Sequence, residues 1–203
     1  MQGSPIWQAI QDGTGNVIGY FINFGQELGI IELVLLYAIA PVLGISIAIW
    51  GIFDLIKLKN PRVQPRPSTG GILAKLIVAP LLFQIALTMG NFSESMFGTD
   101  IITGNEELAA SYVTQADAAS NPVQQALLVG IAFLVVIGWV GGIRAMISFA
   151  RIGSPNENGF DLIKTGSVRL AVSTILCATQ FVADDIAQSF TGTSGAFTST
   201  LGL

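Results

Sequence analysis

The chain reads LVLLYAIAPVLGISIAIWGIF from Leu33 to Phe53, a run of 21 residues without a charged side chain. A helix rises ~1.5 Å per residue, so a run of this length crosses a hydrocarbon core of ~30 Å. Asp54 and Lys57 mark the end of the run, and Pro41 within it predicts a kink or a local break. The run therefore predicts a transmembrane helix.

Three further apolar segments follow, so the fold class expected is an all-α membrane protein with four transmembrane helices in two tandem helical hairpins. Residues 76–93 and 126–143 are free of charge, but the core of the fourth segment, 170–183, has only 14 residues. That is short for a span, and a re-entrant or interfacial segment is the alternative. Pro80 predicts a kink in the second segment.

These segments divide the chain into five parts. The first and last are a non-cytoplasmic N-terminal segment, in which Trp7, Tyr20 and Phe21 suit an interfacial helix or a flexible leader, and a loosely ordered Gly/Ser/Thr-rich tail. The connection between the hairpins is acidic, and part of it is expected to form a surface helix. In order, the parts are 1–29, the first hairpin 30–91, the connection 92–120, the second hairpin 121–188, and the tail 189–203.

Charge is sparse and segregated. Only 11% of residues are charged and mean hydropathy is +0.66, whereas soluble domains carry about 25% charged residues. All nine basic residues fall into two windows, which the positive-inside rule places in the cytoplasm, with both termini on the other side. The windows contain Lys57, Lys59, Arg62, Arg66 and Lys75, and Arg144, Arg151, Lys164 and Arg169.

Local signals place several helix starts. Ser68 or Thr69 is expected to cap the second segment, and Asn121-Pro122 to open the third. Ser154 and Glu157 match a capping box for the fourth.

The two halves of the sequence resemble each other. Gly51-Ile52 pairs with Gly142-Ile143, and the segment from Lys75 to Leu82 pairs with that from Arg169 to Leu176, at offsets of 91 and 94 residues. The pattern favours an internal parallel repeat, against the alternative of chance similarity between apolar helices.

Small residues recur every four positions in the first and third apolar segments. Such residues allow helices to approach closely in lipid. They predict either a self-assembly face between subunits or packing within one bundle. The residues are Ala40, Gly44 and Ala48, and Gly138 and Gly142.

Nothing in the sequence favours catalysis or a cofactor. There is no histidine, and the one cysteine, Cys177, lies in an apolar run where a packing role is expected. No nucleophile elbow, Walker loop or metal-ligand spacing is present, so the protein is expected to be non-enzymatic, without a cofactor or metal. Ionisable residues fall near the ends of the apolar segments, and Gln84 and Gln180 are expected either to bond a neighbouring helix or to line a wet path.

The basic windows admit three interpretations. The simplest is a topology signal that also contacts anionic lipid headgroups. The others are docking of cytoplasmic partner proteins and indirect contact with a nucleic acid that passes through a conduit.

One stretch carries a resemblance to a family. The helix exit from Gly51 to Pro61, the basic proline-rich turn after it, and Gly70-Gly71 resemble the DotE/IcmC and TraQ-type inner-membrane proteins of type IVB secretion and conjugation systems. Over roughly residues 30–185 the likeness is one of topology, and in plan the hairpins are also similar to VirB-type conjugative pilins. The resemblance implies a multi-pass protein of the bacterial inner membrane, with periplasmic termini and a role in an export machine.

The expected function is therefore a non-enzymatic membrane component of a secretion or conjugal transfer apparatus. Its partners would be membrane lipids and other membrane subunits, in a homo- or hetero-oligomer. The alternatives are a pilin-like filament subunit, a holin-like pore-forming protein, and a small transporter subunit.

Overall fold

A computed structural model of the chain describes residues 20, 23–25, 27–60, 67–103, 107–119, 122–154 and 157–201. Every regular element in these residues is a helix, which confirms the all-helical part of the expected fold class. The elements are η1 (Leu35–Ile39), α2 (Ala40–Lys59), α3 (Thr69–Phe83), α4 (Ile85–Phe97), α5 (Leu108–Ala118), α6 (Pro122–Ala150), α7 (Gly159–Cys177), α8 (Thr179–Thr191) and α9 (Ala196–Leu201).

The first long helix contains a π-helical turn. The turn η1 and α2 belong to one helical stretch, Asn23–Lys59. The N–H of Ala40 bonds the carbonyl of Leu35, five residues back. Pro41 follows directly and has no N–H to donate, so the wider turn lies where the regular hydrogen-bond ladder must be interrupted. The irregularity expected at Pro41 is thus a π turn.

The helix α3 returns alongside α2. The hydroxyl of Ser68 accepts the N–H of Gly71 and caps α3, as one of the two expected alternatives. A Cβ at Gly44 of α2 would lie 2.8 Å from the carbonyl oxygen of Ala79, so the absence of a side chain lets the two helices approach closely.

The second apolar segment breaks after α3. Helix α4 turns away from α3 by 95° at Gln84, one turn beyond Pro80. The hydroxyl of Thr88 donates to the carbonyls of Leu81 and Gln84, which satisfies backbone acceptors freed by the bend.

Helix α6 is the centre of the bundle. It begins at Pro122, as the sequence predicts, and contacts α3, α4, α5, α7 and η1. Trp139, near its middle, is fully buried. The connection between the hairpins supplies α5, the expected surface helix, which packs against α6.

Helix α7 is capped differently from the expectation. Asn158 is its N-cap and accepts the N–H of Phe160, so the capping box predicted at Ser154 is wrong. The N–H of Glu157 instead bonds the carbonyl of Ser154, and the Glu157 side chain pairs with Arg151. The side chain that a capping box would use is therefore committed to an ion pair.

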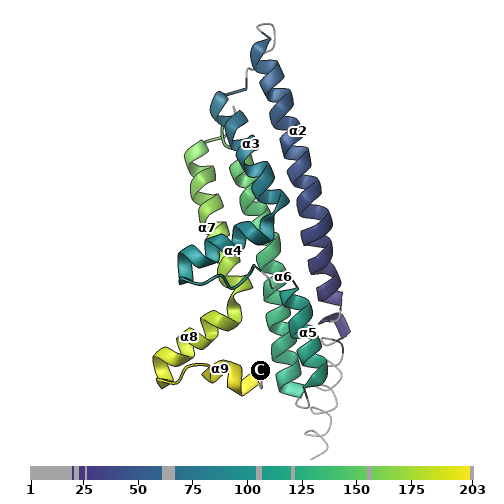
Figure 1. The fold of residues 1–203 in the computed structure, drawn as a ribbon, viewed down its shortest axis with the longest axis vertical. Coiled ribbons are helices and arrows are strands. Elements are labelled where there is room, and N and C mark those ends of the chain that lie inside the picture. The colour runs from purple at the N-terminus through teal and green to yellow at the C-terminus, as the bar shows by residue number, and fades with distance from the viewer. Residues whose placement is uncertain are drawn as a thin grey trace, which may run out of the picture.

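The fourth segment also bends, and the tail contains a further helix. Helix α8 leaves α7 at an angle of 78° at Ala178. The tail, expected to be loosely ordered, includes the short helix α9, which lies beside α8 (Figure 1).

The two hairpins correspond at an offset of 94 residues in their breaks and bent helices, whereas the ends of α2 and α6 at the turns are 91 residues apart. The breaks fall at Gln84 and Ala178, and the bent helices α4 and α8 both have 13 residues. Both end at a left-handed glycine, Gly98 with φ 76° and Gly192 with φ 71°. The correspondence therefore covers α3, where it contacts α2, and the whole of α4.

Equivalent side chains also make equivalent contacts. A Cβ at Gly138 of α6 would lie 2.8 Å from the carbonyl oxygen of Ser173 in α7, which repeats the approach of Gly44 to Ala79 in the first hairpin. At the basic end, Lys75 bonds Asp54, and Arg169 bonds Ser148 in the second hairpin.

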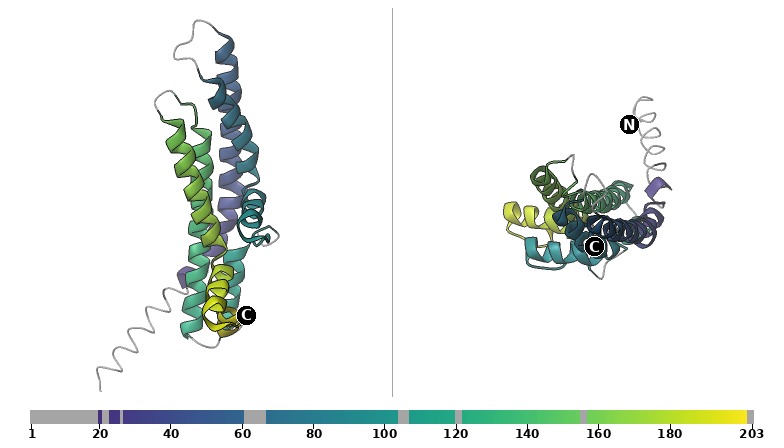
Figure 2. Two further views of the ribbon diagram at one scale, coloured as in Figure 1. Left: turned by 90° about the vertical axis from the view of Figure 1, so that its left-hand side faces the viewer. Right: turned by 90° about the horizontal axis from the view of Figure 1, so that it is seen from above.

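The long helices form a row. Among the residues described, the main contacts between them are α2 with α3, α3 with α6, and α6 with α7. Helices α2 and α7 therefore lie at opposite edges, and α2 and α6 run in the same direction (Figures 1 and 2). Two helices, Asn23–Lys59 and Val123–Ala150, are long and apolar enough to cross a membrane, and up to four segments are if each bent pair counts as one span.

Candidate functional site

A buried carboxylate lies inside the bundle, beside the middle of α6. Glu32 has no exposed surface, and its Oε1 accepts the indole N–H of Trp139 at 2.7 Å. Its Oε2 accepts the backbone N–H groups of Ala109 at 2.8 Å and Ala110 at 3.3 Å. The carboxylate thus joins the first long helix, α5 and α6 at one point.

These contacts explain how α5 is held. Its own N-cap residue, Glu107, makes no side-chain cap hydrogen bond. Ala109 and Ala110 are in the first turn of α5, where N–H groups have no partner within the helix. A carboxylate is favoured there by hydrogen bonding and by the helix dipole. Glu32 therefore caps α5 from a helix 77 residues away in the sequence.

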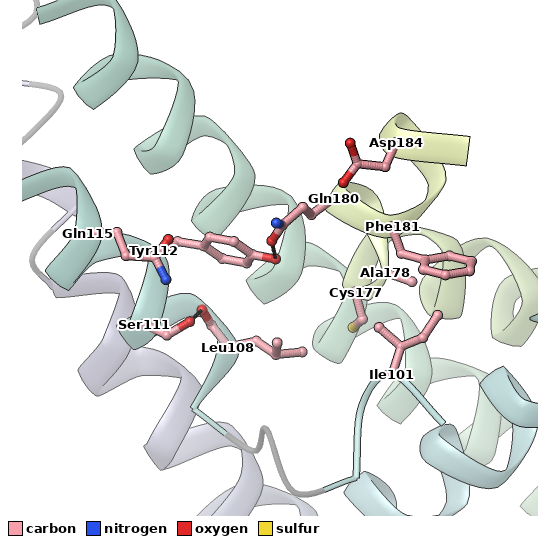
Figure 3. A pocket seen from close by; sticks show the side chains of 10 residues that line it. All are labelled: Ile101, Leu108, Ser111, Tyr112, Gln115, Cys177, Ala178, Gln180, Phe181 and Asp184. Atoms are coloured by element: carbon pink, nitrogen blue, oxygen red, sulfur yellow. Dashed lines mark hydrogen bonds between the residues drawn. The ribbon is translucent and has the colours of Figure 1, made fainter. Parts of the chain in front are cut away.

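A cavity of about 310 Å³ opens beside this point, between α5 and the bend from α7 to α8. Figure 3 shows polar and apolar groups on its walls. Polar side chains come from both sides, and Leu108, Ile101 and Phe181 supply the apolar part. The polar side chains are Ser111, Tyr112 and Gln115 of α5, and Gln180 and Asp184 of α8.

Tyr112 bridges the two walls of the cavity. Its hydroxyl donates to Oε1 of Gln180 at 2.7 Å, and Gln180 donates from Nε2 to the hydroxyl of Thr198 at 3.2 Å. Burial raises the pKa of Tyr112 to about 12. The phenol is therefore neutral and acts as a hydrogen-bond donor at physiological pH.

A second carboxylate acts on α9 as Glu32 acts on α5. Oδ1 of Asp184 accepts the N–H groups of Phe197 and Thr198, both at 2.9 Å, and its other oxygen accepts the Thr198 hydroxyl. Phe197 and Thr198 are in the first turn of α9. Asp184 thus holds the tail against the rim of the cavity.

The basic side chains lie at the other end of the bundle, near the two turns. Asp54 accepts from Lys75 at 2.5 Å and lies 3.7 Å from Lys57, and Arg169 donates to Ser148 at 3.0 Å. The remaining basic residues that the structure describes are Lys59, Arg144, Arg151 and Lys164, and all of their side chains are exposed. Arg62 and Arg66 lie outside the described residues, as do Trp7 and Phe21.

The small residues singled out in the sequence contact other helices of the same chain. Gly44 faces α3, Gly138 faces α7, and a Cβ at Gly142 would meet Sδ of Met89 in α4. Ala40 is buried and Ala48 packs at the edge of the core. These positions therefore serve packing within one bundle in this structure.

The sequence analysis missed the carboxylate site. Glu32 was placed near the end of an apolar segment, whereas the helix begins at Asn23 and carries Glu32 into the core. A single acid between Ile31 and Leu33 was the available signal. Its partners could not be identified, because Ala109, Ala110 and Trp139 are ordinary residues in the sequence. Gln180 bonds Tyr112 of α5 and Thr198 of α9, as expected for a bond to a neighbouring helix, and it also lines the cavity.

The chemistry of this site is hydrogen bonding. Among the described residues, no three His, Cys, Asp or Glu side chains lie together as metal ligands would. Cys177 at the floor of the cavity is buried, and its Sγ lies 3.7 Å from the carbonyl of Val135. The arrangement suits water or a small polar group between α5, which Glu32 caps, and α8, whose Asp184 holds α9.

No protein-family model, no curated protein and no solved structure matches this chain.

Proposed function

We propose that this protein is a non-enzymatic, multi-pass membrane subunit with four spans in two tandem hairpins, which assembles through its helices into a secretion or conjugal transfer machine. The observation that carries the proposal is an apolar face on α2 that the chain itself leaves uncovered. Val42, Ile49 and Ile56 on this face are between 45% and 61% exposed, on a helix long enough to cross a membrane.

The direction of the helices supports four spans. Helices α2 and α6 run in the same direction (Figure 1), so the chain between them must return across whatever the two helices cross. Helix α3 has 15 residues, about 22 Å at ~1.5 Å per residue, which is less than a hydrocarbon core of ~30 Å. Helix α4 continues the segment after a bend of 95°, so α3 and α4 together form one broken span whose irregular backbone is sheltered by protein.

The charge distribution supports the orientation. In the sequence the basic residues flank the turns α2–α3 and α6–α7, and the helix ends at both turns lie at one end of the bundle (Figure 1). The positive-inside rule assigns that end to the cytoplasm and the termini to the periplasm of a bacterial inner membrane. The same side chains can contact anionic lipid headgroups or cytoplasmic partners. The secretion or conjugation context rests on the resemblance of Gly51–Pro61 and Gly70-Gly71 to the DotE/IcmC and TraQ-type proteins.

The test is a mild-detergent purification of a tagged copy expressed from its native gene cluster, with partners identified by mass spectrometry. Recovery of secretion or conjugation ATPases and other inner-membrane subunits is expected. An untagged strain and a tagged, unrelated multi-pass protein of the same membrane are the controls. Recovery of the protein without any such subunit would contradict the proposal.

A pilin-like filament subunit is a second candidate, because the same uncovered α2 face could pack against other copies outside the membrane. Shearing of cells separates the two functions. A filament subunit is released with the sheared fraction, whereas a membrane component stays with the cells.

A further inference from the structure

Two faces of the molecule are exposed although the equivalent residues of the other hairpin, 94 positions away, are buried. On α6, one stripe of side chains at intervals of three and four residues is between 0% and 7% exposed: Val136, Trp139, Ile143, Met146 and Ala150. The equivalent stripe on α2 is between 45% and 61% exposed: Val42, Ile45, Ile49, Ile52 and Ile56. We call this second set the α2 open face.

The difference comes from neighbours, not from composition. Both stripes are apolar. On each helix, the stripe is adjacent to the side that packs against the other helix of the same hairpin. The α6 stripe is covered because the first hairpin, with α3 and α4, packs beside the second. No described helix packs on the same side of α2, so that side stays open.

Helix α7, at the opposite edge of the row, also has an exposed apolar face. Val78 of α3 is 5% exposed, whereas its equivalent on α7, Val172, is 50% exposed. Val168, one turn earlier on the same side of α7, is 57% exposed. Helix α7 thus presents the surface that α3 uses inside the molecule, and no hairpin follows it in the described chain.

We propose that α7 of one copy packs on the α2 open face of a second copy, in the way that α3 packs on α6 within the chain. This rests on the proposed function and names a partner for its assembly surface, a second copy of the same chain. The contact joins two different faces, so it is heterologous and continues the row α2, α3, α6, α7 from copy to copy. Such a contact closes into a ring or extends as a filament, according to the rotation between copies.

The internal contact gives the register of the external one. A Cβ at Gly71 of α3 would lie 2.9 Å from the carbonyl oxygen of Ile152, just beyond α6. Shifted by 94 residues, Gly71 becomes Thr165 of α7. The last residue of the α6 stripe, Ala150, becomes Ile56, which ends the α2 open face. Both are near the basic end, where a thiol reaches water and oxidant. A disulfide requires Cβ atoms about 3.5–4.5 Å apart, so the pair is a stringent test.

The experiment mixes two tagged copies, one with Ile56→Cys and one with Thr165→Cys, in native membranes under mild oxidation. A cross-linked dimer with both tags is expected, and neither variant alone should form it. Ser167→Cys replaces Thr165→Cys in the matched control, because Ser167 points away from Thr165 on α7 and corresponds to Leu73, an exposed residue of α3. The wild type, with its buried Cys177, is the blank.

A second measurement does not depend on disulfide geometry. Ile49→Trp, in the α2 open face, should shift the protein from oligomer to monomer in native membrane particles. Ile137→Trp is the control, because Ile137 is 40% exposed on a side of α6 that the row leaves free, and it should leave the oligomer intact. Trp is tolerated where a side chain faces lipid near an interface.

Two results would overturn the inference. One is equal cross-linking of Ile56→Cys to Thr165→Cys and to Ser167→Cys, as random collision would give. The other is a monomer in native particles with lipid alone on α2. Recovery of secretion subunits without the specific cross-link would contradict this contact and support the proposed function. The specific cross-link without any secretion subunit would support the contact and contradict the proposed function.

Discussion

At the scale of single residues, two carboxylates each cap a short helix that follows later in the chain, 77 residues on for Glu32 and 13 for Asp184. Glu32 caps α5 and Asp184 caps α9, and each accepts two consecutive N–H groups of a first turn. Sequence analysis recognises caps when the side chain precedes its helix. It has no rule for a cap supplied by another helix, which is why both roles became visible with the structure.

The strongest consequence at this scale concerns Glu32. Replacement by Gln keeps the size but gives one amide oxygen and one NH₂ where three donors converge. At least one buried donor loses its acceptor, so the variant should unfold with a free energy lower by about 1–3 kcal/mol. Reversible unfolding in detergent, followed by circular dichroism, measures the change.

Glu27→Gln is the control, because Glu27 lies on the same helix with an exposed side chain. It should unfold as the wild type does. Trp139→Phe combined with Glu32→Gln should cost less than the sum of the single changes, since both remove the same hydrogen bond. Strict additivity would mean that the two side chains are not energetically coupled.

At the scale of elements, the sequence predicted the long helices well and their bends poorly. The charge-free run at 33–53, the start at Pro122 and the cap at Ser68 follow from local chemistry, and the structure has all three features. The break at Gln84 has a weak signal in Pro80, but the equivalent break at Ala178 has no proline near it. Contacts between elements decide the bends, and a single sequence does not contain those contacts in readable form.

The tether of α9 gives a prediction at this scale. Asp184→Ala removes the acceptor for the N–H groups of Phe197 and Thr198. Residues 196–201 should then exchange their amide hydrogens faster and be cleaved more readily by added protease, while α6 and α7 keep their protection. Hydrogen exchange followed by mass spectrometry resolves these segments.

Asp185→Ala changes the neighbouring residue, whose side chain is exposed, and should leave the tail protected. Equal loss of protection in both variants would mean that the tail is held by the charge of this acidic pair and not by the Asp184 cap.

At the scale of the whole molecule, the repeat and the charge asymmetry act together. The two hairpins correspond at 94 residues, and each carries its basic residues at its turn. An internal duplication of a hairpin with that charge pattern places both turns on the same side of the membrane. The number of crossings then depends on whether each bent pair, α3 with α4 and α7 with α8, returns to the far side.

Cysteine labelling distinguishes the possibilities, and the buried Cys177 makes the wild type a blank. With an impermeant thiol reagent added to intact cells, Ser68→Cys and Ser154→Cys should stay unlabelled, and Ser95→Cys and Ser194→Cys should label. Ser95 lies on α4 and Ser194 follows α8, so both report the far end of a bent pair. Inverted membrane vesicles should give the opposite pattern, which controls for thiols that are buried and not merely sheltered by the membrane.

Protection of all four sites in cells, with labelling of all four in vesicles, would mean that the bent pairs are re-entrant. Since α2 and α6 run in the same direction, one of them would then not cross, and the four-span model would fail.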